Sequence, residues 1–190
     1  MSMKTAIIIH GKPSEKGYFD PGRDAQSNSH WLPWIQHKLL LAGILAQAIE
    51  MPKPYEPVYD DWKNVFERFD VNEETMLIGH SCGGGFLTRW LSEHDVKVGK
   101  VALIAPWLDP DHELKTGFFD FEINPNVPAQ TKGLTIFNSD DDDDDIQQSV
   151  QTLTDAWSAA YLIELHGKGH FTYSDMKTHE FPELKKELLG

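Results

Sequence analysis

The sequence predicts an α/β fold in which a mostly parallel sheet of about six strands has helices on both faces. Short, continuous apolar runs of strand length alternate along the chain with segments whose apolar residues recur at helical spacing. Strands that alternate with helices in this way form parallel sheets. The continuous apolar runs also favour strands that are covered on both faces.

The composition is that of one globular domain, residues 1–190, with 40% apolar residues, six Trp and ten Phe. The net charge of −13 argues against binding to nucleic acid or to anionic membrane surfaces, because both require clustered Lys and Arg. Cys82 is the single cysteine, so no intrachain disulfide can form. No apolar stretch approaches the roughly 18 residues of a membrane span. We therefore expect a cytoplasmic protein with no nucleic-acid or membrane partner.

Each element in the first half of the chain has a local signal. Residues 5–9 and 44–49 are apolar runs of strand length. Residues 12–29 carry Pro and Gly among polar side chains and are expected to form a loop over the strand ends. Residues 30–42 have helical spacing and stop before Gly43. A second helix follows, and its apolar face consists of Trp62, Val65, Phe66 and Phe69.

The second half continues the alternation. Residues 75–78 and 101–104 are apolar runs, and residues 86–91 between them have helical spacing. Residues 107–132 hold four aromatic residues without a clear period. They are expected to form either a lid or pocket insertion, or an irregular segment whose aromatics fill the core. The remaining expected elements are strands at 134–137 and 161–165 and helices at 146–157 and 181–188.

Residues 79–83 carry the strongest chemical signal, because they place Ser81 between a predicted strand and a predicted helix. Their pattern, G-x-S-x-G, fits the nucleophile elbow of α/β-hydrolases. A strand that turns straight into a helix strains the backbone of its middle residue, and only small neighbours leave room for the turn. The start of the helix provides N–H groups and positive dipole beside the serine. The alternative, without a catalytic role, is a glycine-rich turn in which the serine caps the helix.

Two later residues can complete the chemistry of a nucleophilic serine. Sites in parallel sheets lie at the carboxyl ends of the strands, and Ser81, an aspartate of the run 140–145 and His170 follow three separate strands. A serine hydroxyl needs a histidine to take its proton, and the imidazole needs a carboxylate to fix its tautomer. We expect Ser81 to be the nucleophile, His170 the general base and then acid, and Asp142 the orienting carboxylate.

The expected oxyanion donors are the backbone N–H of Cys82 and one from the loop after the first strand, near Gly11. Cys82 stands one residue past the tip of the elbow, so we interpret its thiol as a small apolar neighbour rather than a nucleophile. His80 is expected to pack at the end of its strand. A histidine such as His170, in a glycine-flanked loop, can also be a surface residue without a role.

The run of six aspartates is also consistent with roles outside catalysis, because a charge run is usually a solvated loop. Alternate aspartates from Asp140 fit the spacing of a calcium loop. However, Asp145 stands where such a loop requires glycine, and Gln151 where it requires a bidentate glutamate. His166 and His170 have metal-ligand spacing only on a helix, and the glycines between them argue against one. We therefore expect no metal and no cofactor.

Several motifs of this chain occur together, and in the same order, in one known family. They lie at residues 8–11, 30–34, 51–54, 78–83, 139–142 and 169–171. On these motifs the chain resembles the small single-domain serine hydrolases that include retinoblastoma-binding protein 9 and short bacterial α/β-hydrolases. The resemblance implies an α/β-hydrolase fold and a triad of Ser81, Asp142 and His170.

The chain departs from the family pattern at two places. The family usually has Asp-x-x-Val-Pro after the fifth strand, and here Ile146-Gln147 stands in place of Val-Pro. Counting back from Ile146 gives Asp143 as the triad acid, whereas counting forward from Ser139 gives Asp142, which we prefer. Residues 12–29 are also longer than usual, which leaves the second oxyanion donor open.

Two hypotheses for function follow. The first is a serine hydrolase that cleaves a small-molecule ester, thioester or amide through an acyl-enzyme. The second is a non-enzymatic interaction module on the same fold, because the family's name implies a protein partner. The presence of all three triad residue types favours the enzyme.

Overall fold

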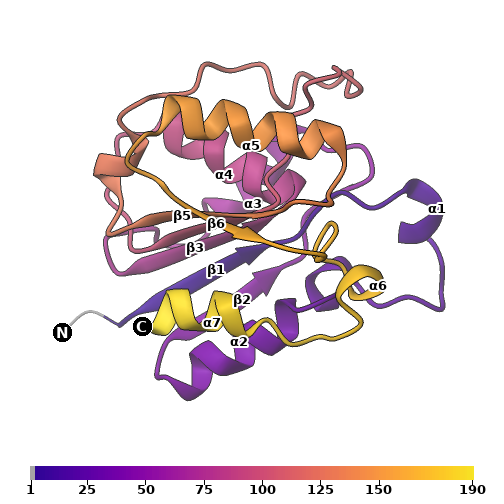
Figure 1. Cartoon of the computed structure of the whole chain (residues 1–190), viewed down its shortest axis with the longest axis horizontal. Coiled ribbons are helices and arrows are strands. Elements are labelled where there is room, and N and C mark those ends of the chain that lie inside the picture. The colour runs from indigo at the N-terminus through magenta and orange to yellow at the C-terminus, as the bar shows by residue number, and fades with distance from the viewer. Residues whose placement is uncertain (1–2) are drawn as a thin grey trace.

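The structure is a computed structural model that describes residues 3–190, and its strands form one six-stranded sheet (Figure 1). Every neighbouring pair is parallel, in the order β2-β1-β3-β4-β5-β6. The predicted fold class is therefore confirmed. The strands are β1 (Thr5–Ile9), β2 (Leu45–Ile49), β3 (Thr75–His80), β4 (Val101–Ile104), β5 (Leu134–Ser139) and β6 (Tyr161–Leu165).

The register of the central strands determines which loops meet. β1 lies next to β3, and Ile9 at the end of β1 pairs with Gly79 near the end of β3. The segments that follow these two strands therefore leave the sheet side by side. The four central strands are almost entirely buried, as their continuous apolar runs predict. The edge strand β6 is largely exposed.

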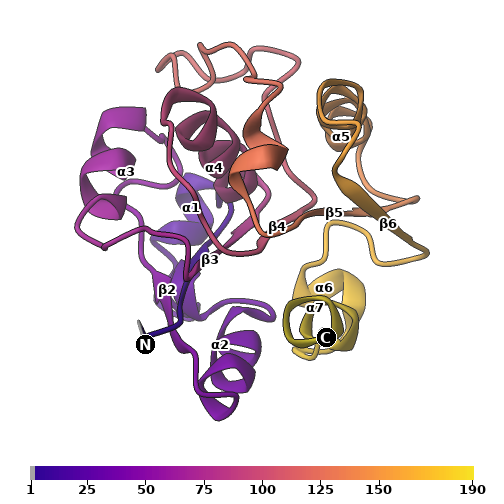
Figure 2. The ribbon, with the colours of Figure 1, turned by 90° about the vertical axis from the view of Figure 1, so that its left-hand side faces the viewer.

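Helices cover both faces of the sheet (Figures 1 and 2). One face carries α3 (Tyr59–Phe66), α4 (Cys82–Glu93) and α5 (Asp144–Ala156), and the other carries α2 (Leu32–Leu41) and α7 (Pro182–Leu189). Each long helix presents an apolar face to the sheet, in agreement with its sequence period. Within residues 3–190, no helix is both long enough and apolar enough to cross a bilayer.

Two short helices lie near the carboxyl ends of the strands (Figure 1), and the sequence pattern predicts neither of them. α1 (Glu15–Tyr18) interrupts the segment 12–29, whose prediction as a plain loop is therefore wrong in part. The Ser14 hydroxyl caps α1 by accepting the Gly17 N–H at 3.1 Å. α6 (Tyr173–Met176) begins with a capping box. Single-turn 3₁₀ helices occur at Gln26–Asn28 and Val127–Gln130.

The segment 107–132 divides between the core and the strand ends. Phe118 is fully buried and packs edge-on against Tyr59 and Trp62 of α3. Arg89 of α4 holds this part of the segment by donating to the carbonyl of Phe118 at 2.8 Å. Trp107, at the start of the segment, instead lies beside the end of β3.

The tight contact between α4 and β1 gives a first prediction. A Cβ on Gly83 would lie 2.5 Å from the backbone carbonyl oxygens of Ile9 and His10. Ala is intrinsically better than Gly in a helix by about 1 kcal/mol, but backbone cannot move aside cheaply. We expect Gly83→Ala to lower the free energy of unfolding by about 1–3 kcal/mol in urea titrations. The matched Gly22→Ala, whose Cβ meets only the Asp20 side chain, should have little effect. Equal stability of both variants would contradict the packing described.

Candidate functional site

Ser81 lies at the turn between β3 and α4 with an unusual backbone, φ 53° and ψ −122°. A positive φ is strained for a serine, so the surroundings must enforce it. The Ser81 N–H donates to the carbonyl of Ile104 in β4 at 2.9 Å, and the Ser81 carbonyl accepts the N–H groups of Gly85 and Trp107 at 3.1 Å each. A Cβ on Gly79 would lie 2.7 Å from the backbone of α4, so the turn also requires glycine there.

The loop after β1 lies directly against Ser81. A Cβ on Gly11 would be 3.0 Å from the Ser81 Cβ and 3.5 Å from its Oγ. His10 fixes this loop, because its Nε2 accepts the Met51 N–H at 3.0 Å and its Nδ1–H donates to the Gly11 carbonyl at 2.8 Å. Burial lowers the pKa of His10, which keeps the ring neutral and able to accept at Nε2.

Cys82, the first residue of α4, is fully buried. Burial raises the pKa of its thiol, so the sulfur stays protonated. This agrees with the interpretation of the side chain as an apolar neighbour. Its backbone N–H belongs to the first turn of α4, where helix N–H groups have no partner within the helix.

His170 lies in the loop after β6 and contacts one of the two aspartates that the sequence leaves open. Its Nδ1 is 3.0 and 3.1 Å from the two carboxylate oxygens of Asp142. The Asp142 side chain is only 1% exposed and also accepts the Asp143 N–H at 2.8 Å. Asp143 itself is exposed and occupies the N-cap position of α5.

The protonation of His170 reflects two opposing effects. Burial disfavours the charged ring, but the hydrogen bond to Asp142 and the charge of that carboxylate outweigh it, so the pKa of His170 is raised. The contact at Nδ1 leaves the proton-accepting position at Nε2 when the ring is neutral. That arrangement suits a general base.

Two other aspartates of the run, Asp140 and Asp141, hold the same loop, a role that the sequence does not predict. Asp140 accepts from the His166 ring at 2.7 Å and from the Gly167 N–H at 3.2 Å. Asp141 accepts the Gly169 N–H at 2.9 Å. Successive carboxylates therefore clamp successive parts of the loop 166–170. No cluster of three or more His, Cys, Asp or Glu side chains arranged to hold a metal ion occurs in the described part of the chain.

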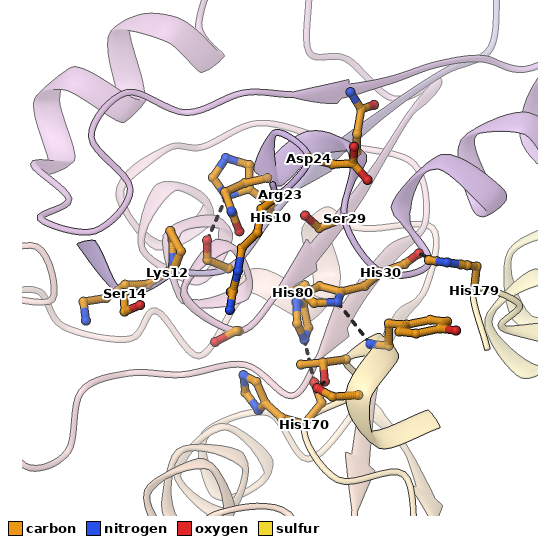
Figure 3. A pocket seen from close by; sticks show the side chains of 18 of the residues that line it. His10, Lys12, Ser14, Arg23, Asp24, Ser29, His30, His80, His170 and His179 are labelled. Atoms are coloured by element: carbon orange, nitrogen blue, oxygen red, sulfur yellow. Dashed lines mark hydrogen bonds between the residues drawn. The ribbon is translucent and has the colours of Figure 1, made fainter. Parts of the chain in front are cut away.

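His80 holds His170 from the opposite side. Its Nε2–H donates to the backbone carbonyl of His170 at 2.8 Å, and the two rings lie 5.0 Å apart (Figure 3). Burial lowers the pKa of His80 well below its usual value, so the ring is a neutral donor. The sequence pattern predicts only packing for His80. Its position next to Ser81 was the only local signal, because its partner is 90 residues away.

Ser81 and His170 border the same two cavities, of about 460 and 150 Å³. The Ser81 hydroxyl is largely covered, with the residue 8% exposed, and it opens onto these cavities. No direct hydrogen bond joins the Ser81 hydroxyl to the His170 ring among the contacts of residues 3–190. Hydrogen bonds of this kind often tighten only when substrate is bound. Gly11, Lys12 and the two histidines His80 and His170 complete the surroundings of the hydroxyl.

Comparison with known proteins identifies the family of the chain. Residues 18–188 match the family model described as "Serine hydrolase". The chain belongs to the serine hydrolase family. A Bacillus subtilis (strain 168) protein named "Putative hydrolase YdeN" is 28% identical over 164 residues, which is 81% of this chain and 84% of that protein. The predicted enzyme class, a serine hydrolase, is thereby confirmed.

Several solved structures have the same fold as this chain. The crystal structure of the ydeN gene product from B. subtilis superposes with a TM-score of 0.80 at 24% identity, covering 98% of this chain and 97% of that one. Est1E from Butyrivibrio proteoclasticus gives a TM-score of 0.64 at 15% identity, covering 99% and 87%. The predicted α/β-hydrolase fold is confirmed. The narrower resemblance to retinoblastoma-binding protein 9 stays a prediction.

The Asp142 contact gives a second prediction. Because the carboxylate stabilises the charged ring, His170 should titrate above pH 6.5, and Asp142→Asn should lower its pKa. Asp143→Asn is the matched control, since Asp143 acts on the ring only through its charge and should shift the pKa less. NMR of the His170 ring against pH measures both. A larger shift in Asp143→Asn would make Asp143 the partner of His170.

The same pKa shift links stability to pH. A ring whose pKa is raised in the folded state stabilises that state below the unfolded pKa of about 6.5, and this contribution is lost as the pH rises through the folded pKa. As the pH rises from about 6.5 through the folded pKa, the free energy of unfolding measured in urea should therefore fall more in the wild type than in Asp142→Asn.

Proposed function

We propose that this serine hydrolase cleaves a small ester, thioester or amide through a covalent acyl-enzyme, with Ser81, His170 and Asp142 as its triad. The observation that carries the proposal is the pairing of His170 Nδ1 with the buried Asp142 carboxylate at 3.0 Å. His170 and the strained Ser81 line the same two cavities. A buried carboxylate on one ring nitrogen leaves the other nitrogen free to take a proton, which is the arrangement that a general base requires.

The residues support a sequence of proton transfers that needs no cofactor. His170 Nε2 takes the proton of the Ser81 hydroxyl as Oγ attacks the substrate carbonyl carbon. Asp142 stabilises the imidazolium that forms, which then gives its proton to the leaving group. A water molecule then gives its proton to His170 as its oxygen bonds to the acyl carbon. His170 returns that proton to Ser81 Oγ as the bond between Oγ and the acyl carbon breaks. Each transfer uses the same nitrogen, so the position of the His170 loop governs both half-reactions.

The oxyanion of the tetrahedral intermediate needs donors that are fixed before the reaction. The proposed donors are the backbone N–H groups of Cys82 and Gly11. The first belongs to the N-terminal turn of α4, where the helix dipole also favours negative charge. The second belongs to the loop that His10 anchors against Ser81. Both donors are backbone groups, which a substituted side chain cannot remove.

The substrate class and setting follow from the sequence and from the relatives. A small molecule fits cavities of a few hundred cubic ångströms. Esters come first among the candidates, because one structural neighbour is described as the esterase domain from a Rhodothermus marinus protein. A cytoplasmic location, and membership of the narrower retinoblastoma-binding protein 9-like group with a protein partner, remain expectations from the sequence.

A fluorophosphonate probe tests this proposal. The probe should label the wild type at Ser81, identified by peptide mass spectrometry, and Ser81→Ala should abolish both labelling and hydrolysis of p-nitrophenyl acetate. We expect kcat to fall by at least about 10⁴-fold, because the three residues act as a unit. Ser158→Ala, at an exposed serine beyond α5, is the matched control and should behave as the wild type. Intact labelling of Ser81→Ala would refute the assignment of the nucleophile.

A further inference from the structure

The larger cavity at the site is lined mainly by residues with hydrogen-bonding side chains (Figure 3). Its volume is about 460 Å³, within the range of small-molecule sites. Its sides come from the segment 12–29 and from residues 172–179, and its floor includes Ser81 and His170. Among the described residues that line it, Pro13 is the only one besides glycine without a polar side-chain atom.

The polarity of this wall comes from hydrogen-bonding groups rather than from net charge. The Arg23 side chain already pairs with Asp20 at 3.5 Å, and the charge of Asp24 opposes that of Lys12. Burial lowers the pKa of His30 to about 4, so its ring is neutral. Hydroxyl, amide and neutral imidazole groups therefore dominate the lining.

The wall is fixed by contacts between its two sides. His30 accepts the Tyr173 N–H at Nδ1 at 3.1 Å, and the His30 carbonyl accepts from the His179 ring at 2.6 Å. The His179 ring stacks on Tyr173 with centroids 4.4 Å apart. These bonds join the start of α2 to the α6 segment across the cavity. A preorganised polar wall selects for ligands that match its hydrogen-bonding groups.

The second cavity at the site is much smaller, about 150 Å³, and its lining combines Trp107 and Ile146 with the charged side chains of Lys12, Glu113, Asp143 and Asp145. Only a few water volumes fit there, which corresponds to a short acyl group. The two cavities meet at Ser81 and His170. An ester held at Ser81 can therefore place a short acyl group in the smaller cavity and a larger alcohol among the hydrogen-bonding side chains of the larger one.

We infer that the enzyme acts on short-chain acyl esters of a polyhydroxylated alcohol of about monosaccharide size, whose hydroxyl groups bind in the larger cavity. An alkyl group there would displace water from polar groups without replacing the hydrogen bonds, which is costly. Sugar hydroxyls replace those hydrogen bonds. This inference rests on the proposed function, because it names the substrate of the same site.

The reaction balances without any further reactant. The Ser81 Oγ forms a bond to the acyl carbon, and the bond from that carbon to the alcohol oxygen breaks. The Ser81 proton passes through His170 to the departing alcohol. Water then cleaves the acyl-enzyme, which gives a carboxylic acid and restores the serine hydroxyl.

A pair of esters with matched shape tests the inference. Methyl 6-O-acetylglucopyranoside carries ring hydroxyls that cyclohexylmethyl acetate lacks. To correct for the intrinsic reactivity of each ester, its rate of enzymatic acetate release is divided by its rate of hydrolysis by hydroxide alone. Since each hydrogen bond contributes about 1 kcal/mol, kcat/KM should favour the sugar ester by at least about tenfold. The double variant Gln26→Leu with Asn28→Leu should reduce this preference, because both side chains line the cavity. Gln148→Leu, at an exposed position of α5 outside the cavity, should retain it.

The outcomes separate this inference from the proposed function. Equal or faster cleavage of cyclohexylmethyl acetate would overturn the inference and leave the hydrolase intact. Failure to cleave the sugar ester, with Ser81 still labelled by fluorophosphonate, would also overturn the inference. Loss of Ser81 labelling itself would instead refute the proposed mechanism. An unchanged preference in the double variant would show that the larger cavity does not bind the alcohol.

Discussion

The backbone of Ser81 is the constraint on which the rest of the site depends. Its φ of 53° turns the chain from β3 directly into α4, which brings α4 against the end of β1. This approach explains why Gly79 and Gly83 flank the serine, since side chains there would meet backbone atoms. Hydrogen bonds from β4, α4 and Trp107 hold the strained conformation. The same turn exposes the hydroxyl to both cavities.

The aspartate run solves a second physical problem, which is how to hold a histidine in a loop that contains two glycines. Six neighbouring carboxylates repel one another unless donors surround them. Here Asp140, Asp141 and Asp142 accept hydrogen bonds from the loop 166–170, so the negative charge stabilises the loop. His80 adds a bond to the carbonyl of His170 from the β3 side. The imidazole is thus fixed through its ring, its backbone and the preceding residue.

The sequence predicts the sheet and the elbow well, because both depend on local patterns. Continuous apolar runs predict strands that are buried on both faces, and the spacing of small residues around Ser81 predicts the turn. The preference for Asp142 over Asp143 came from counting forward from Ser139. The structure gives a reason for that count, because Ser139 ends β5 and Asp143 is already the N-cap of α5. Of the two candidates, Asp142 is therefore the one left to face His170.

The features that the sequence did not predict depend on distant contacts. α6 is too short to be stable alone, and its first N–H donates to a histidine 143 residues earlier. The bond from His80 to the His170 carbonyl joins residues 90 apart. The polar wall of the larger cavity comes from two segments that have no shared sequence motif. The periodicity of a short segment cannot predict contacts between residues that are far apart in the sequence, so these contacts are seen only in the folded chain.

A crystal structure of the protein after reaction with a fluorophosphonate would test the proposed triad. We expect phosphorus bonded to Ser81 Oγ, with its oxygen facing the N–H groups of Cys82 and Gly11. His170 Nε2 should lie within hydrogen-bond distance of the adduct while its Nδ1 still contacts Asp142. An adduct whose nearest base is a residue other than His170, or a His170 ring detached from Asp142, would contradict the account.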